Sequence, residues 1–123
     1  TQADVRELQL AKAAIASGID LLLGELGRTA GEIADIYIAG AFGNHVRAQD
    51  VLDLGMLPPV APERIHFIGN AALTGAEAVL RSKTARQKTV QLAQKVDYVE
   101  ISGRSDFQDA FVDAIAFREL AGH

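Results

Sequence analysis

Apolar residues recur through the first part of the chain at intervals of three and four, the spacing that places them on one face of a helix. They are Val5, Leu8, Ile15, Ile19, Leu22 and Leu26, and a second stripe of Leu10, Ala14 and Leu21 lies on nearly the opposite side. A helix that is apolar on two sides packs between two neighbours. The pattern predicts a sandwiched helix from a cap within residues 1–4 to about Gly27.

Three short apolar runs, at residues 36–39, 65–68 and 98–101, predict buried strands, and the first two are followed at once by glycine. Helices are expected between and after the strands, over about 47–54, 71–82, 85–95 and from 105 onward. Strands that alternate with helices are typical of an α/β fold with a parallel sheet. We therefore expect a three-layer partial parallel sheet with flanking helices.

For the last two predicted helices, the sequence also indicates the capping residue and the buried face. Thr84 is expected to cap the helix over 85–95, with Val90, Leu92 and Ala93 facing inward. Ser105 or Asp106 is expected to cap the final amphipathic helix. Its inner face is predicted to carry Phe107, Phe111, Ile115 and Leu120.

Composition narrows the function classes. The 123 residues are 49% hydrophobic and 23% charged, which is typical of one folded domain. The formal net charge of −4 does not favour nucleic acid. The absence of cysteine excludes disulfides, zinc–thiolate sites and iron–sulfur ligation within these residues.

The chain begins at Thr1, and we expect it to be a segment excised from a longer protein. It shows no signal-peptide pattern and no apolar run of roughly 20 residues, the length that spans a bilayer. We therefore expect no membrane association and take the cytoplasm as the default location.

Small residues follow the first predicted strand directly: Gly40, Ala41, Phe42, Gly43 and Asn44. They would let a ligand approach the backbone, whose free N–H groups suit phosphate or a sugar hydroxyl. In open α/β sheets, ligands bind outside the carboxyl ends of the strands. Because neither a dinucleotide fingerprint nor a P-loop is present, a tight strand-to-helix turn is an equal alternative.

Gly69 and Asn70 follow the second predicted strand in the same way, and Gly75 lies inside the helix after it. A glycine in a helix costs about 1 kcal/mol relative to alanine, so Gly75 needs a reason. Dense packing against another helix is the first interpretation, and contact with a ligand is the second.

Three polar residues, Arg6, Gln9 and Lys12, lie one turn apart along the first predicted helix. They could contact an adenine or a ribose. A solvated edge, with the Lys12 stem lying along apolar neighbours, is the favoured alternative.

No catalytic or metal site is expected in these residues. His45, His66 and His123 lack the spacing of metal ligands, and His66 alternates with core positions on a strand. Asp50 and Asp53 are expected to be solvated, and no nucleophile–base pair or carboxylate dyad is present. The residues indicate a binding surface without a reaction centre.

Six segments occur in a fixed order: TQADVRELQLAK at 1–12, AGAFGN at 39–44, GMLP at 55–58, FIGNAA at 67–72, YVEI at 98–101 and DFQDAF at 106–111. Together they resemble the C-terminal part of the reductive activators of corrinoid proteins. The resemblance covers almost the whole chain, and the ordered set is more specific than any one segment.

The resemblance implies a function for the longer protein. Such activators carry an N-terminal plant-type [2Fe–2S] domain, linking domains and a C-terminal ATP-binding domain of the acetate kinase, sugar kinase, Hsp70 and actin superfamily. They reduce an inactive Co(II) corrinoid protein to Co(I) in an ATP-dependent way, with Mg²⁺ expected beside ATP. The resemblance therefore implies a corrinoid protein as partner, and places the iron–sulfur cluster outside this chain.

The resemblance also implies which residues meet the nucleotide. The loop from Gly40 to Asn44 matches the adenosine motif of the superfamily. The hinge-side connecting helix of the superfamily matches Gly69, Ala72, Gly75 and Ala76. The helix before the loop borders the adenine in related proteins, which makes Arg6, Gln9 and Lys12 candidates again.

Parts of the superfamily domain do not occur in this sequence, namely the two phosphate-binding hairpins and the first connecting helix. We therefore expect the chain to bind the nucleoside end weakly, without hydrolysing ATP or moving electrons. It is expected to be the distal half of an actin-like domain, with a core over 1–82 and an αβα extension over 83–123. An unprotected sheet edge would favour a homo-oligomer.

Two alternatives from other function classes stay open. The chain could be a non-catalytic module for dimerisation or for docking the corrinoid partner. It could also be an α/β domain that binds another phosphorylated ligand, such as coenzyme A.

Overall fold

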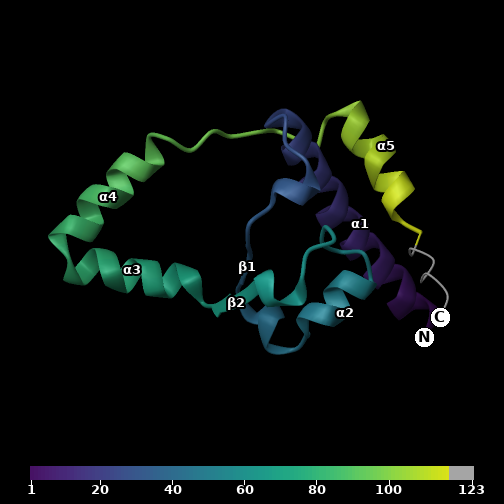
Figure 1. Cartoon of the computed structure of the whole chain (residues 1–123), viewed down its shortest axis with the longest axis horizontal. Coiled ribbons are helices and arrows are strands. Elements are labelled where there is room, and N and C mark those ends of the chain that lie inside the picture. The colour runs from purple at the N-terminus through teal and green to yellow at the C-terminus, as the bar shows by residue number, and fades with distance from the viewer. Residues whose placement is uncertain (117–123) are drawn as a thin grey trace.

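The computed structural model describes residues 1–116, apart from the side chain of Asn44 (Figure 1). It begins with the long helix α1 (Gln2–Glu25), close to the bounds that the apolar stripes predict. The hydroxyl of Thr1 accepts a hydrogen bond from the backbone N–H of Asp4, and the Asp4 carboxylate accepts one from the amino group of Thr1. This reciprocal capping stabilises the first turn of α1.

Two strands, β1 (Ile36–Ala39) and β2 (Ile65–Gly69), pair in parallel. Ile36 is opposite Ile65, and the register shifts by one residue after Ile38. A short 3₁₀ turn at Ala30–Glu32 precedes β1, and helix α2 (Ala48–Asp53) with 3₁₀ turns at Ala41–Asn44 and Pro62–Arg64 forms the connection between the strands. The predicted α/β class, with a small parallel sheet and flanking helices, is confirmed.

The core lies between α1, α2 and one face of this sheet. Its buried members are Val51, Met56, Leu57 and Ile65, against which Ile19, Ile36 and Ile38 also pack. Alternation along the strands places Tyr37 and His66 on the opposite face, where their rings stack at a centroid distance of 5.0 Å. Nε2 of His66 also lies 2.8 Å from a carboxylate oxygen of Asp35, so His66 ties β2 to the residue that precedes β1.

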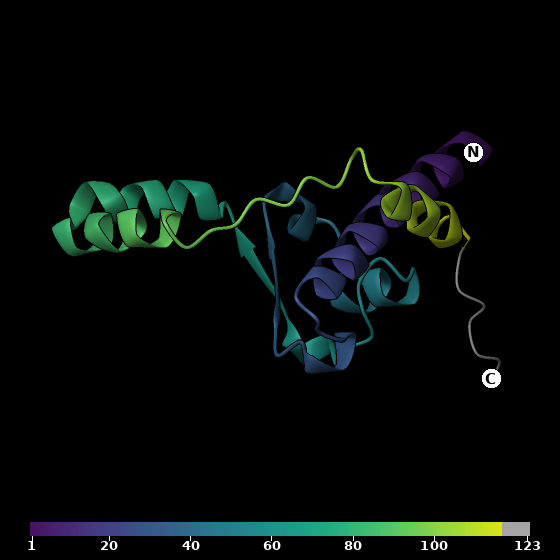
Figure 2. The ribbon, with the colours of Figure 1, turned by 90° about the horizontal axis from the view of Figure 1, so that it is seen from above.

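Helix α5 (Ser105–Ala114) returns to pack along α1 (Figure 2). Lys12 on α1 is only 3% exposed, and its ammonium donates hydrogen bonds to the carbonyl oxygens of Ala114, at 2.7 Å, and Ala116. Carbonyl oxygens at a helix C-terminus carry partial negative charge and have no partner within the helix. Lys12 therefore holds the end of α5 against α1, so the expected snorkelling on a solvated edge is wrong.

Helices α3 (Ala71–Arg81) and α4 (Lys83–Ala93) form an antiparallel pair that projects away from the other helices (Figures 1 and 2). We call this pair the arm. Val90 and Leu92 are 58% and 62% exposed, and Ala93 is exposed as well, so the expectation that they face inward is wrong. The reason is that α4 has its main contact with α3 among the described residues.

Two of the predicted helix caps are also wrong. Ser82, not Thr84, caps α4, because its hydroxyl accepts a hydrogen bond from the N–H of Ala85. The cap position of α5 is Arg104, whose guanidinium bonds the carboxylates of Asp106 and Glu25 and so ties α5 to the end of α1.

The predicted third strand over residues 98–101 does not form. This stretch crosses from the arm to α5 (Figure 1), with Tyr98 83% exposed and Ile101 against Gly18 of α1. The Glu100 carboxylate accepts hydrogen bonds from Ser102 and Tyr98, and these bonds lower its pKa to about 2. Local side-chain bonds thus replace sheet pairing, and the β element expected in the extension over 83–123 is absent.

The last helix is otherwise as expected up to residue 116. Phe107 and Phe111 lie on the partly buried side of α5, with ring centroids 6.1 Å apart. The expected inward position of Leu120 lies outside the described residues. Across residues 1–116, no helix is both long and apolar enough to cross a membrane.

Lys12→Met should destabilise the docking of α5. Methionine keeps the apolar stem but leaves two partly buried carbonyl oxygens without their donor, which costs on the order of 1–3 kcal/mol. Urea unfolding should show a lower midpoint, and the amides of α5 should exchange faster with solvent. The control is Lys95→Met, which removes an exposed charge outside the α1–α5 contact. Equal unfolding midpoints for both variants would contradict this role for Lys12.

Candidate functional site

The two strands end side by side at glycines. The N–H of Gly40 donates to the carbonyl of Gly69 at 2.7 Å, which closes the carboxyl edge of the sheet. Gly40 has φ of 89° and Gly69 has φ of 60°, conformations that side chains rarely adopt. Among the described residues, no atom beyond the two adjoining residues lies within 4 Å of where a Cβ would stand on Gly40 or Gly69. The edge therefore presents bare backbone to open space.

The loop after β1 is a 3₁₀ turn, Ala41–Asn44, and two of its residues differ in role. A Cβ on Gly43 would lie 2.5 Å from the ring of Phe67, so Gly43 is required by packing against β2. Phe42 is 45% exposed and lines an apolar hollow of about 310 Å³ between α1 and β1. The tight turn and the open surface that the sequence left as alternatives thus occur together in one loop.

The start of α3 adjoins the same edge, since Asn70 follows Gly69 directly. The Asn70 side-chain oxygen accepts from the N–H of Leu73 at 3.0 Å, and its carbonyl accepts from that of Thr74. The first N–H groups of a helix have no partner within it, and two of those in α3 donate no bond to Asn70. Here they belong to Ala71 and Ala72, beside the bare backbone at the strand ends, and they favour an anionic or hydroxyl group.

Gly75 lies one turn further along α3 and is exposed. A Cβ there would meet nothing within 4 Å, so dense packing does not explain this glycine within the described residues. The surface of α3 at Gly75 is instead open, like the backbone at Gly40 and Gly69.

The other candidates lie elsewhere. Arg6 and Gln9 line a separate hollow along the first turns of α1, together with Gln2, Ala3, Val5 and Glu7. Lys12 is directed at the end of α5. The structure thus brings the Gly40–Asn44 loop together with Gly69 and Asn70, and does not join the polar residues of α1 to them.

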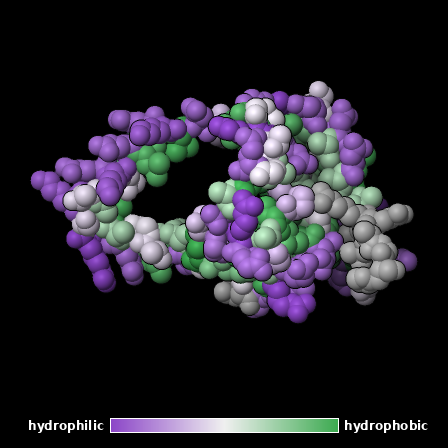
Figure 3. Space-filling model, in the orientation of Figure 1, coloured by the Kyte–Doolittle hydropathy of each residue, from purple (hydrophilic) through white to green (hydrophobic). Residues whose placement is uncertain are grey.

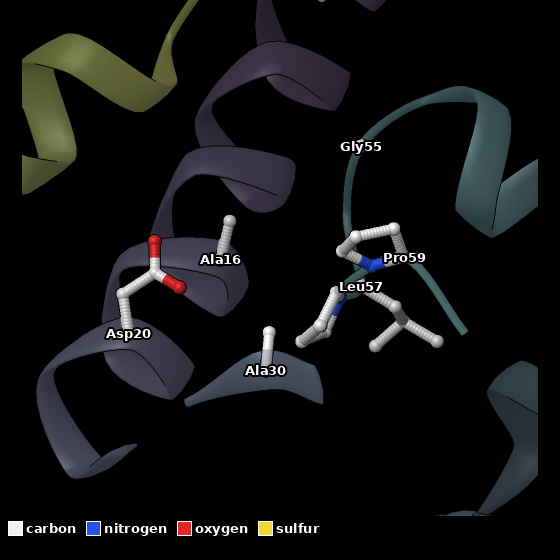
Figure 4. Close-up of a pocket in the computed structure, with 7 residues that line it drawn as sticks. Ala16, Asp20, Ala30, Gly55, Leu57 and Pro59 are labelled. Carbon is white, nitrogen blue, oxygen red and sulfur yellow. The ribbon is translucent and has the colours of Figure 1, made fainter. Parts of the chain in front are cut away.

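A second polar hollow follows the side of α1 (Figure 4). One part, of about 80 Å³, lies between Asp20 of α1 and the Leu57–Pro59 turn. An adjoining part, of about 310 Å³, reaches Asp113 of α5. Among the described residues no group of three or more His, Asp or Glu side chains is arranged to hold a metal.

Charged groups near the loop pair with one another. The guanidinium of Arg47 bonds the Asp50 carboxylate at 2.7 and 3.0 Å, and this lowers the pKa of Asp50 and raises that of Arg47. Both side chains are largely exposed, so the pair fixes the start of α2 without creating a reactive group. Asp50 is therefore paired rather than merely solvated.

The donor set of the open edge fits a nucleotide better than a metal. Bare backbone at Gly40 and Gly69, two free N–H groups on α3 and the Phe42 ring provide donors and an apolar surface, without a carboxylate cluster. The chain has no cysteine, so it supplies no thiolate to an iron–sulfur cluster.

Sequence reasoning missed two features near the site. The apolar hollow beside Phe42 arises from Ile15, Ile19 and Met56, which are far apart in the chain. The projection of the arm was also missed, although the absence of acidic residues between Glu77 and Asp97 marks it as an unusual surface.

Comparison with known proteins assigns the family. Residues 1–121 match the family described as the C-terminal domain of RACo, the ASKHA domain. The corrinoid activation enzyme RamQ of Eubacterium limosum is 35% identical over 112 residues, covering 91% of this chain and 19% of that protein. A reductase of Methanosarcina barkeri, named for a Co(II) methylated amine-specific corrinoid protein, is 26% identical over 119 residues, 95% of this chain and 22% of its own length.

A solved structure, a reductive activator for a corrinoid iron–sulfur protein, superposes with a TM-score of 0.87 and 33% identity. The match covers 95% of this chain and 19% of that one, so the arm is included in it. The chain spans about a fifth of the length of the relatives it matches. From its match over residues 1–121, the chain belongs to the family of C-terminal RACo domains, the ASKHA domain.

Proposed function

We propose that this chain is part of the ATP-binding domain of a protein that reductively activates corrinoid proteins. The observation that carries the proposal is the open carboxyl edge at Gly40 and Gly69, found in a domain of the ASKHA family. In such a protein, ATP binding or hydrolysis would be coupled to electron transfer from a [2Fe–2S] cluster elsewhere to Co(II), giving Co(I).

The chemistry explains why a nucleotide domain belongs to a redox protein. Co(I) is a very strong reductant, so its formation from Co(II) is thermodynamically uphill. A ligand shifts such an equilibrium only by its difference in affinity for two conformations. A nucleotide that bridges the two halves of a domain binds the closed form more tightly, which supplies that difference.

The residues of this chain would contact the nucleoside end of ATP. The bare backbone at Gly40 and Gly69 allows close approach, and the exposed Phe42 ring offers a surface on which a base can stack. The N–H groups of Ala71 and Ala72 would donate hydrogen bonds to a sugar hydroxyl or a phosphate oxygen. Mg²⁺ and the terminal phosphates would be held by other parts of the longer protein.

Titration of the chain with ATP at millimolar concentration should shift the NMR amide signals of Gly40, Gly69 and Asn70. Gly40→Ala should weaken these shifts, because alanine at φ of 89° is strained by roughly 1–3 kcal/mol. The control is Gly24→Ala, since Gly24 lies in α1 with free space around it.

Two results of this titration would count against the nucleotide site. One is the absence of shifts at the strand ends while the fold stays intact. The other is displacement of ATP by an acyl-coenzyme A at equal concentration, which would favour a different phosphorylated ligand.

In the longer protein, Gly40→Val should slow the ATP-dependent formation of Co(I), followed by the visible absorbance of the corrinoid. The valine side chain would both strain the backbone and fill the open edge. The ATP concentration that gives the half-maximal rate should therefore rise, and the maximal rate of Co(I) formation should fall. Gly24→Ala should leave the rate unchanged. A Gly40→Val protein with the ATP dependence of the unaltered protein would contradict the assigned role of the loop.

A further inference from the structure

The arm is strongly basic. Residues 71–95 contain one acidic residue, Glu77, and five basic ones, Arg81, Lys83, Arg86, Lys88 and Lys95. All five basic residues are exposed, and among residues 1–116 none of them forms an ion pair. Figure 3 shows hydrophilic side chains along the outer rim of the arm. The arm therefore presents uncompensated positive charge to solvent.

The rest of the chain has the opposite charge. Outside residues 71–95, the sequence contains seven basic and fifteen acidic side chains. A nucleoside triphosphate is strongly negative, so the field of this larger part of the chain repels it. The field of the arm attracts it, because clustered charge of one sign raises the local concentration of ligands of the other sign.

The arm starts at the proposed nucleotide site. Asn70, which caps α3, directly follows Gly69 at the open edge. Arg81 is the last of the 11 residues of α3, and a rise of about 1.5 Å per residue puts its Cα roughly 15 Å from the first. Lys83 begins α4 just after it. Arg81 and Lys83 thus lie beyond hydrogen-bonding distance of a group at the edge, at a range over which only their charge acts.

Salt sets the range of this action. The Debye length is about 30 Å at 0.01 M salt and about 8 Å at 0.15 M salt. At the lower concentration, charges on the arm act on a triphosphate at the strand ends across the roughly 15 Å that α3 spans. At the higher concentration, most of their effect is screened. An influence of the arm on nucleotide binding is therefore distinguished from direct contact by its dependence on salt.

We propose that the arm attracts the phosphates of a nucleotide toward the open edge by long-range electrostatic force. It would favour a triphosphate over an uncharged nucleoside without bonding the phosphates itself. This inference rests on the proposed function, because it takes the nucleotide to lie at Gly40 and Gly69. It assigns a role to the charges of the arm, which its packing against the rest of the chain does not explain.

Titration of the chain with ATP and with adenosine, both without Mg²⁺, tests the proposal through the NMR amide shifts of Gly40 and Gly69. The variant Arg81→Glu/Lys83→Glu reverses two charges at the turn between α3 and α4. At about 10 mM salt its dissociation constant for ATP should rise at least about five-fold, and at about 300 mM salt less than about two-fold. Its dissociation constant for adenosine should stay unchanged, because adenosine carries no charge.

The matched control is Arg81→Lys/Lys83→Arg, which changes both side chains and keeps both charges. Its dissociation constant for ATP should equal that of the unaltered chain at both salt concentrations. Glutamate is unfavourable at the end of α3 and favourable at the start of α4, so the helix-dipole effects of the double reversal oppose one another. Circular dichroism should show that both variants keep their helices.

The outcomes separate this proposal from the proposed function. An absence of ATP-dependent shifts at Gly40 and Gly69 would overturn both. Shifts at these glycines, with a dissociation constant for ATP that the double reversal leaves unchanged at low salt, would overturn only the role of the arm. An equal loss of affinity in the charge-keeping variant would overturn that role too, because the loss would not follow charge. The same holds for shifts centred on the arm, which would indicate that ATP binds there by contact.

Discussion

The parallel pairing of two short strands determines where the core, the open backbone edge and the start of α3 lie. It is closed by the hydrogen bond from the N–H of Gly40 to the carbonyl of Gly69, so both strands end at the same level. Ile36, Ile38 and Ile65 then face α1 and α2 and form the core. Because α3 begins just after Gly69, the strand pairing also places the N-terminus of α3 beside the loop that follows β1. The open backbone edge and the arm are both consequences of this junction.

The core around this junction is small, and contacts between distant parts of the chain complete it. Lys12 binds the carbonyl end of α5, and Arg104 connects the start of α5 to Glu25 near the end of α1. These two contacts attach both ends of α5 to α1. The domain is thus held by few apolar residues and by polar contacts at helix termini, where unpaired backbone groups make a charged partner most effective. The arm lies outside this framework.

Local patterns in the sequence predicted most of the elements. The length of α1 and the apolar runs of β1 and β2 depend on neighbours a few positions away, and these predictions are confirmed. The prediction that both apolar stripes of α1 are covered is wrong, because Val5, Leu22 and Leu26 are exposed. The predictions for residues 98–101 and for the inner face of α4 were wrong because they depend on tertiary context. An apolar run becomes a strand only beside a free sheet edge, and an apolar helix face is buried only if something covers it. For the site, the sequence indicated the loop and Gly69, whereas the packing of Gly43 and the direction of Lys12 required the fold.

The central claim is that the strand ends at Gly40 and Gly69 face the nucleotide. Photolabelling the longer protein with an azido-adenine analogue of ATP, followed by mass-spectrometric mapping, tests it most directly. The account predicts that labelled peptides include residues 37–44 or 67–76, and that unmodified ATP suppresses the labelling. Labelling of this domain confined to residues 1–12 or to α5 would contradict the account, because it would place the adenine at the far side of α1.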